Sequence, residues 1–405
     1  MTDPAQIRFL DNRTPPHIVT LVAIAGLAAA TMNIYLPSLP DITAHFETDY
    51  RLVQLSVPLY LAASAVMQLA IGPISDRFGR RPVLLWSFAI FAVFTVAILI
   101  APGPWTFLFC RVGQAVVVSG MVLSRAIVRD IYPQDKAASM IGYVTMGMAL
   151  VPMIAPLIGG VLAELFGWES NFWFLLLLGA LVSWVVWRDL GETAAARDGS
   201  LTQQFREAPE LLTSRRFWGY NIAMACSSGA FFAYLGGAPF VGSEVFSLSP
   251  GMLGLLFGAP AIGYLAGNAA SGLYSARFGI NRMILVGAMI GICGPGLSLT
   301  LFFVGHETAL VFFGLMTFVG LGNGLVIPNA TAGMLSVRPH LAGTASGLGG
   351  AMMVGGGAAL SALAGALMVP GAGAYPLLFV MMTTSACALT SIVYVILRER
   401  QLRAI

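Results

Sequence analysis

The chain contains the stretch Gly72-Pro-Ile-Ser-Asp76-Arg77-Phe78-Gly79-Arg80-Arg81 and, 200 residues later, the stretch Gly272-Leu-Tyr-Ser-Ala276-Arg277-Phe278-Gly279-Ile280-Asn281. The two copies share both glycines, the serine, the arginine at the sixth position and the phenylalanine. Each copy stands at the end of an apolar segment, 52–73 in the first half and 250–273 in the second. Repeated sets of membrane spans are typical of secondary transporters. We therefore expect a chain built from two related halves.

The composition requires a membrane environment. Of 405 residues, 58% are hydrophobic and only 10% are charged, whereas a soluble domain carries about 25% charged residues. The 21 basic and 18 acidic side chains are too few to cover a soluble fold of this length. These numbers exclude a cytosolic enzyme, a nucleic-acid-binding protein and a disordered chain. The net charge of +3 gives no reason to expect an anionic macromolecular partner.

Polar or Pro- and Gly-rich breaks divide the sequence into twelve apolar stretches, of which the fifth covers 138–163. About 20 apolar residues suffice for a membrane-spanning helix, and continuous apolar runs exclude the alternation of a β-barrel strand. We predict an all-α membrane protein with 12 transmembrane helices in two pseudo-symmetric six-helix bundles. The predicted parts are a cytoplasmic tail (1–17), an N-terminal bundle (18–187), a cytoplasmic linker (188–216), a C-terminal bundle (217–397) and a cytoplasmic tail (398–405).

The basic residues predict the orientation of these spans. If the N-terminus is inside, nearly all Lys and Arg residues fall in inner loops, whereas the outer loops are mostly acidic with Arg51 as their only basic residue. Cytoplasmic loops of membrane proteins carry such an excess of positive charge. Since the number of spans is even, both termini are expected in the cytoplasm.

Three further motifs accompany the repeated stretch. They are Asn33-Ile-Tyr35-Leu36-Pro37, Ser124-Arg125-Ala-Ile-Val-Arg129-Asp130-Ile-Tyr132 and Gly322-Asn323-Gly324-Leu-Val-Ile-Pro328-Asn329-Ala330. With 72–81, these motifs resemble the bicyclomycin/chloramphenicol-resistance (Bcr/CflA) branch of bacterial drug:proton antiporters in the major facilitator superfamily. The resemblance covers about 18–400 and implies the major facilitator fold and alternating access. It also implies a bacterial inner membrane, a small-molecule drug substrate, protons as partners and no cofactor.

The repeated stretch is the predicted conformational gate at the cytoplasmic mouth. The gate residues are Gly72, Asp76, Arg77, Gly79, Arg80, Arg129 and Asp130. The resemblance implies that Asp76 is a latch that holds the cytoplasmic side closed. Its expected partner is the N-terminus of the eleventh span near 341–344, because carboxylates are stabilised at helix N-termini. Alternatively, Arg80 and Arg81 are ordinary inside charges.

Arg111 is the only charge placed well inside a span, and an intramembrane ionisable residue is a functional candidate. Arg111 and Gln114 match a fourth-span motif that the resemblance links to proton movement. Together with Val118, Met121 and Arg125, they recur at helical spacing and are expected on one face. Alternatively, the Arg111 side chain reaches the outer surface, about seven residues away.

The resemblance makes Asn33 a proton-coupling position, because the family usually has Asp there. Asn cannot release a proton. Three explanations stay open: protons couple elsewhere, for instance at Asp41 or Glu164; the protein is an uncoupled facilitator; or the asparagine is an engineered mimic of the protonated acid.

The inward faces of several spans are expected to form a substrate cavity. Candidate substrate-binding residues are Asn33, Tyr35, Tyr60, Gln114, Met146, Phe231, Tyr234, Phe257 and Asn323. Each could instead be a packing residue. A mostly apolar cavity without acids suits neutral or zwitterionic lipophilic compounds, and methionines supply adaptable contacts.

The leading functional prediction is therefore a secondary active multidrug efflux transporter for chloramphenicol- or bicyclomycin-like compounds. The alternative is an uncoupled or proton-coupled exporter or facilitator of a small metabolite such as an amino acid or sugar. We expect no enzyme, because the sequence has no His, Asp or Ser cluster at the membrane surface. A phosphate-binding Gly-Lys-Ser/Thr loop is also missing, so ATP is not the expected energy source. We expect a monomer without metal sites or a nucleic-acid partner.

Overall fold

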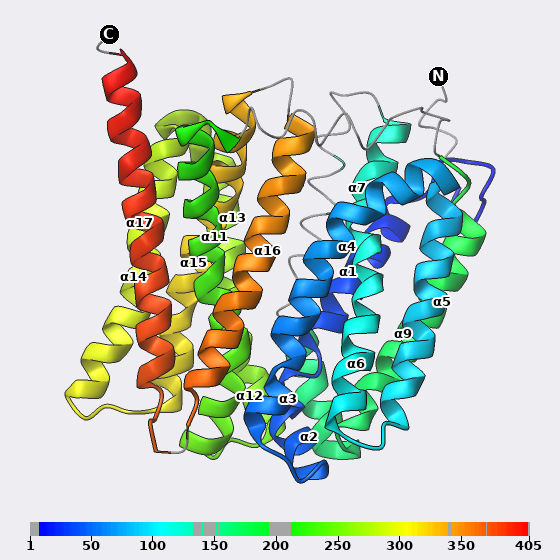
Figure 1. Ribbon diagram of the computed structural model, residues 1–405, viewed down its shortest axis with the longest axis horizontal. Helices are drawn as coiled ribbons and strands as arrows, with labels where there is room; N and C mark the ends of the chain where they lie inside the picture. Colours follow the sequence, from blue (N-terminus) through cyan, green and yellow to red (C-terminus); the bar gives the residue numbers. More distant parts are fainter. Residues whose placement is uncertain are drawn as a thin grey trace.

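The computed structural model describes residues 8–132, 140, 144, 151, 154–193, 212–338, 342–369 and 371–403, and within these ranges it contains helices and no strand (Figure 1). Eleven of the helices are long and apolar enough to cross a membrane. Half of the predicted fifth span, 138–163, lies outside the described residues, and its end forms an apolar helix at Ile154–Phe166. The all-helical prediction is confirmed for the described residues, and the count is consistent with twelve spans.

The first half forms one bundle. Its helices are α1 (Ile18–Asn33), η2 (Leu36–Ser38), α2 (Leu39–His45), α3 (Tyr50–Gln54), α4 (Ser56–Phe78), α5 (Arg80–Leu99), α6 (Pro104–Gln114), η3 (Ala115–Val118), α7 (Ser119–Ile131) and α9 (Glu169–Asp189). The second half forms another bundle beside it. Its helices are α11 (Arg215–Phe240), η4 (Val241–Val245), α12 (Pro250–Phe257), α13 (Ala259–Phe278), α14 (Ile280–Phe303), α15 (Ala309–Val337), α16 (Ala342–Leu367) and α17 (Tyr375–Arg403).

The repeated stretch makes the same turn in both bundles. Gly79 joins α4 to α5 with a φ of 92°, and Gly279 joins α13 to α14 with a φ of 83°. A side chain with a Cβ rarely adopts this positive φ, whereas glycine does so readily. The two matching glycines therefore allow the same backbone conformation, and the repeat in the sequence corresponds to a repeat in the structure.

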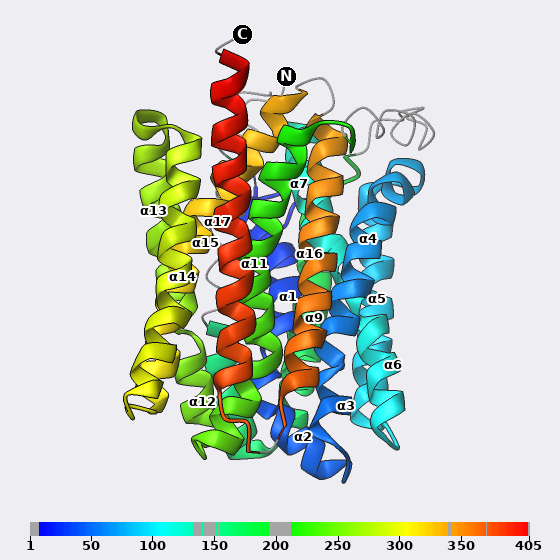
Figure 2. The ribbon, with the colours of Figure 1, turned by 60° about the vertical axis from the view of Figure 1, so that its left-hand side comes forward.

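The start of α1 and the end of α17 lie on the same face of the molecule, called here the terminal face (Figure 1). The turns after α4 and α13 are on that face too, as Figures 1 and 2 show. The predicted linker 188–216 falls largely outside the described residues, whereas 8–17 of the first predicted tail and 398–403 of the second are described.

At the face opposite the termini, the two bundles are joined by direct contacts. Gln54 donates from Nε2 to the carbonyl oxygen of Ser361 at 3.0 Å. The Glu164 carboxylate accepts from the backbone N–H of Gly251 at 2.8 Å. A Cβ built on Gly254 of α12 would stand only 2.4 Å from the Pro156 carbonyl oxygen, so the backbones touch there. This end of the interface is closed.

Candidate functional site

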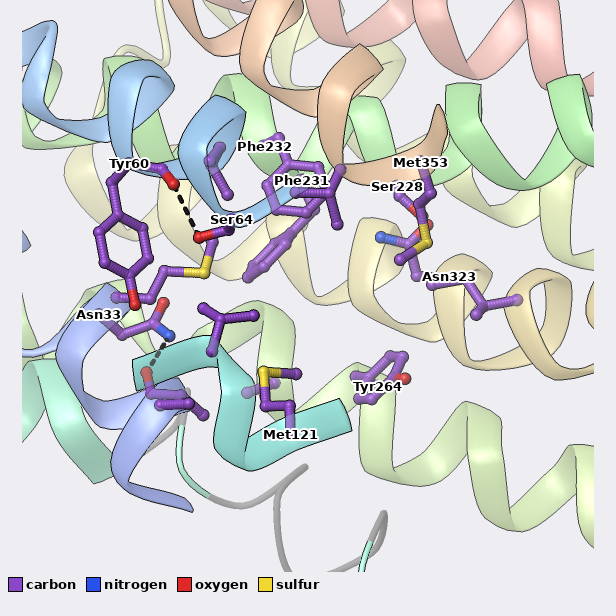
Figure 3. A pocket seen from close by; sticks show the side chains of 18 of the residues that line it. Asn33, Tyr60, Ser64, Met121, Ser228, Phe231, Phe232, Tyr264, Asn323 and Met353 are labelled. Carbon is purple, nitrogen blue, oxygen red and sulfur yellow. Dashed lines mark hydrogen bonds between the residues drawn. The ribbon is translucent and has the colours of Figure 1, made fainter. Parts of the chain in front are cut away.

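A cavity of about 240 Å³ lies between the two bundles. The first bundle contributes residues of α1, α4, η3 and α7, and the second contributes residues of α11, α13, α15 and α16 (Figure 3). The lining residues are Ala28, Ala29, Met32, Asn33, Tyr60, Leu61, Ser64, Gln68, Val118, Met121, Ser228, Phe231, Phe232, Pro260, Ala261, Tyr264, Gly320, Asn323, Ile327, Met353 and Val354. None of these side chains is charged, so the wall suits a molecule without net charge.

Two unpartnered polar atoms mark the end of the cavity that belongs to the first bundle. Asn33 donates from Nδ2 to the Ala29 carbonyl oxygen at 2.7 Å, while its Oδ1 has no partner. The hydroxyl of Tyr60 also has no partner, although the side chain is buried. Both residues line the cavity (Figure 3). Buried polar groups are normally hydrogen-bonded, so this pair has hydrogen-bonding capacity that the described conformation leaves unused.

The end of the cavity that belongs to the second bundle is mainly aromatic. Phe231 and Phe232 lie with ring centroids 6.2 Å apart, and Met353 faces them from α16 (Figure 3). The second bundle also contributes the polar residues Ser228, Tyr264 and Asn323. The Asn323 Oδ1 already accepts from Ser227 Oγ at 2.6 Å, and the Ser228 hydroxyl donates to the Met224 carbonyl oxygen at 2.9 Å. This end therefore offers mainly dispersion contacts to an apolar body.

Four of the predicted substrate-binding residues lie outside the cavity wall. Tyr35 and Gln114 are fully buried in the first bundle, where the Tyr35 hydroxyl is 3.0 Å from Ser56 Oγ. Tyr234 and Phe257 pack together in the second bundle, and the Tyr234 hydroxyl donates to the Phe257 carbonyl oxygen at 3.1 Å. Met146 lies outside the described residues. Of the candidates, Asn33, Tyr60, Phe231 and Asn323 do line the cavity.

The internal repeat points to wall residues that were not predicted. Tyr60, Leu61 and Ser64 of α4 stand 200 positions before Pro260, Ala261 and Tyr264 of α13, and all six line the cavity. The spacing of the repeated stretch thus contained the signal for Ser64 and Tyr264. Neither residue belongs to a motif, which is why both were missed.

Arg111 is completely buried inside the first bundle, so its side chain does not reach a membrane surface. Its guanidinium carbon lies 4.0 Å from the ring centroid of Tyr35 and 4.7 Å from that of Tyr60. Its nitrogens donate to Gln114 Oε1 and to the Thr31 carbonyl oxygen. Among the described residues no carboxylate forms an ion pair with Arg111. Its charge is therefore balanced by ring faces and neutral oxygens.

The fourth span does not present one continuous face. Between α6 and α7 the chain makes a 3₁₀ segment, η3, at Ala115–Val118. A 3₁₀-helix has three residues per turn instead of 3.6, so this segment rotates the helix on either side of it. As a result Arg111 and Gln114 point into the first bundle, while Val118 and Met121 line the cavity.

At the terminal face, Arg80 is the centre of the predicted gate. It forms ion pairs with Asp76 at 2.5 Å and with Asp130 at 3.0 Å. It also donates to the hydroxyl of Ser75. Asp76 is thus paired within its own loop, and its predicted partner near 341–344 lies outside the residues whose side chains are described.

The other gate candidates surround this centre. Arg77 packs its guanidinium 5.4 Å from the Phe78 ring centroid, and Arg129 is exposed. Gly72 accepts weakly from Arg80 through its carbonyl oxygen at 3.5 Å. Gly79 provides the turn described above.

Two glutamates with structural contacts at the terminal face were not predicted. Glu192 follows the sixth span, and Glu399 lies near the end of the twelfth. Glu192 accepts from the backbone N–H of Arg80 at 2.9 Å and from that of Arg81 at 3.3 Å. In the second bundle Glu399 accepts from Arg216 at 2.6 Å and from Asn281 Nδ2 at 2.7 Å. Both carboxylates hold the start of the helix after the repeated turn. Each is more than a hundred residues from the contact it makes, so no local motif predicts it.

Comparison with known proteins agrees with this architecture. Residues 21–362 match the Major Facilitator Superfamily. The chloramphenicol resistance protein of Pseudomonas aeruginosa is 30% identical over 81% of this chain and 79% of its own length. Multidrug resistance protein D of Escherichia coli is 28% identical over 90% of this chain and 91% of its own length. A solved structure of a bacterial homologue of the human lysosomal transporter Spinster has a TM-score of 0.70 at 19% identity, with 95% and 96% of the two chains covered. The chain is a multi-pass membrane transporter of the major facilitator superfamily and of the Bcr/CflA type, with relatives named for chloramphenicol, bicyclomycin and multidrug resistance.

Proposed function

We propose that this transporter exports lipophilic compounds that are neutral or zwitterionic, such as drugs of the chloramphenicol and bicyclomycin kind. The observation that carries the proposal is the uncharged cavity between the bundles, with unpartnered polar atoms at one end, aromatic side chains at the other and methionines in both walls. A polycation would need carboxylates in this wall, and a sugar would need many more hydrogen-bonding groups. The names of relatives in Pseudomonas aeruginosa and Escherichia coli support the same class of substrate.

The proposed mechanism is alternating access across the bacterial inner membrane, with both termini in the cytoplasm. Contacts at the face opposite the termini close that end of the interface. The distribution of basic residues supports placing the terminal face in the cytoplasm. The described conformation then has its outer end closed, and export requires the bundles to part at Gly254 and Gln54. The protein acts as a monomer and carries out no chemical step on its substrate.

The test of the proposed substrate class is resistance. Expression in a bacterial strain that lacks its own drug pumps should raise tolerance to chloramphenicol. A matched control is Phe231→Asp, which puts a carboxylate into the apolar end and should abolish the gain for a neutral drug. If wild-type and variant chains give the same tolerance, or if neither protects, the proposed class is wrong.

Proton coupling is the finer part of the proposal. The Asn33 amide donates to the Ala29 carbonyl oxygen. An aspartic acid at this position can make the same bond only while it is protonated. Proteoliposomes with and without an imposed pH gradient should therefore show that Asn33→Asp changes how strongly transport responds to the gradient. An unchanged response in the variant would show that Asn33 is not at a proton site.

A second candidate is an uncoupled facilitator. It is favoured by one observation: no carboxylate pairs with Arg111 or lines the cavity among the described residues. Wild-type transport that runs down the drug gradient at one rate, with or without a pH gradient, would support the facilitator over the antiporter.

A further inference from the structure

A hollow of about 380 Å³ lies on the outward face of α5, away from the cavity. It is lined by Arg81, Pro82, Leu85, Trp86 and Ala89. These positions are one, three or four residues apart and so share one face of the helix. The hollow begins at the terminal face, where α5 starts (Figure 1). It takes no part in the transport site described above.

The upper edge of the hollow is cationic. Arg81 donates from Nη2 to the Trp187 carbonyl oxygen at 2.8 Å, which ties α5 to the end of α9. Its Nε has no partner. Arg188 is the next residue after Trp187 in α9. Its side chain is exposed, and its guanidinium carbon lies 5.8 Å from the ring centroid of Trp187. Glu192 is on the backbone side of this edge, where it accepts from the Arg81 amide.

The lower part of the hollow is apolar and faces outward. Trp86 is 70% exposed and stands about 7.5 Å along the helix from Arg81, at 1.5 Å per residue. Below it, Ala89 leaves space, and Val93 is 67% exposed. Cations at one level and an indole just below reproduce the profile of a lipid, from headgroup to acyl chain.

The second bundle supplies an internal comparison. At the positions that match Arg81, Trp86 and Ala89 it has Asn281, Val286 and Met289. Its α14 nevertheless forms the same helix after the same turn. The fold of the repeat therefore does not require the arginine, the tryptophan or the small residue, and their presence together on α5 alone calls for another reason.

We propose that this hollow binds one anionic phospholipid from the leaflet at the terminal face. Arg81 and Arg188 hold the phosphate, the Trp86 indole lies at the ester level, and one acyl chain runs over Ala89 and Val93. Basic pockets at this level bind anionic headgroups. The site is independent of which compound the cavity transports, so it stands even if the proposed drug class is wrong.

The experiment is native mass spectrometry of the full-length transporter, titrated with phosphatidylglycerol or phosphatidylcholine. Wild-type protein should retain one phosphatidylglycerol in preference to phosphatidylcholine. Each arginine near a membrane surface contributes a factor of about five in lipid affinity. Arg81→Gln and Arg188→Gln should therefore each weaken retention of phosphatidylglycerol about fivefold. Trp86→Leu, which removes an exposed ring, should weaken retention of both lipids.

The matched controls are in the second bundle. Arg282→Gln removes the charge of an exposed arginine next to Asn281. Val286→Ala shortens the side chain at the position that matches Trp86. Both should leave phosphatidylglycerol retention unchanged. Equal losses in Arg81→Gln and Arg282→Gln would mean a general charge effect and would overturn the site. Competition by soluble glycerol phosphate would overturn the lipid as occupant, and so would a dimer held together through α5.

Discussion

Replacing Arg80 should lower the thermal stability of the protein more than replacing Asp76 does. Arg80 and Asp130 have side chains only 10% and 14% exposed, with nitrogen and oxygen 3.0 Å apart. Removing one partner of a buried ion pair costs about 3–5 kcal/mol, because the other charge is left uncompensated. We take the lower end, about 3 kcal/mol, for Arg80→Gln. A domain of bundle size loses about 2–4 °C in Tm per kcal/mol, so the expected fall is about 6–12 °C.

Asp76 should behave differently, although it also pairs with Arg80. Its side chain is 37% exposed, and an ion pair of this kind contributes at most about 1 kcal/mol. Asp76→Asn leaves Arg80 paired with Asp130, so Tm should fall by no more than about 4 °C. If Asp76 is a latch, transport should nevertheless fall severely, since the latch would act on the balance between conformations.

The assay is thermal unfolding of the purified protein in detergent, followed by intrinsic fluorescence, beside transport in proteoliposomes. The double variant Arg80→Gln/Asp130→Asn completes a cycle that isolates the coupling of the pair. It should be more stable than Arg80→Gln alone, because no buried carboxylate is left unpaired. The Asp76 carboxylate also loses Arg80, but it is 37% exposed and can be solvated. If Asp76→Asn lowers Tm as much as Arg80→Gln does, or if the double variant is the least stable, the ranking drawn from burial is wrong.

Three further predictions concern other parts of the molecule. Arg111→Met should change Tm by less than about 4 °C, because it leaves no buried carboxylate without a partner. Transport should nevertheless be lost. A large fall in Tm would show that Arg111 has an ionic partner. Gly254→Ala brings a Cβ to 2.4 Å from the Pro156 carbonyl oxygen, so it should hold the outer end open. A cysteine introduced on the outer side of the cavity should then be labelled faster. Gly296→Ala is the control, because a Cβ there meets nothing within 4 Å, and it should leave the labelling unchanged. Asp189→Asn, at a fully buried carboxylate that accepts three hydrogen bonds from the N-terminal segment and α1, should cost about 3 kcal/mol and expose that segment to protease.

Features that repeat along the chain could be predicted from the sequence. The apolar runs gave the spans, and the matching glycines at 79 and 279 gave the two related turns. The direction of single side chains could not be predicted in the same way. Tyr35 and Tyr60 both stack on Arg111, yet only Tyr60 lines the cavity. The difference depends on how α1 and α4 are rotated, which tertiary packing decides.

Contacts between distant segments were also beyond the reach of local patterns. The η3 segment, four residues of 3₁₀-helix, changes the rotation of the fourth span. The residue types of Ala115–Val118 do not predict this change. Glu192 and Glu399 fall within the predicted linker and the predicted second tail, but each completes the turn of its own bundle. Such roles are set by which helix ends meet in space, so they emerge only from the fold.

The unpartnered polar atoms of the described cavity wall belong to one bundle. The unpartnered oxygens of Asn33 and Tyr60 belong to the first bundle, and Phe231 and Met353 belong to the second. A ligand shifts a conformational balance only as far as it binds the two conformations differently. In the proposed alternating access, the distance between these two walls changes when the bundles rock. Both walls carry apolar side chains, for example Leu61 and Met121 in the first bundle and Phe231 in the second, so an apolar ligand touches both. Only a ligand that also has polar groups can bind the unpartnered atoms of Asn33 and Tyr60. Its binding energy therefore depends more strongly on the separation of the walls, and this kind of molecule is better able to drive the exchange between states.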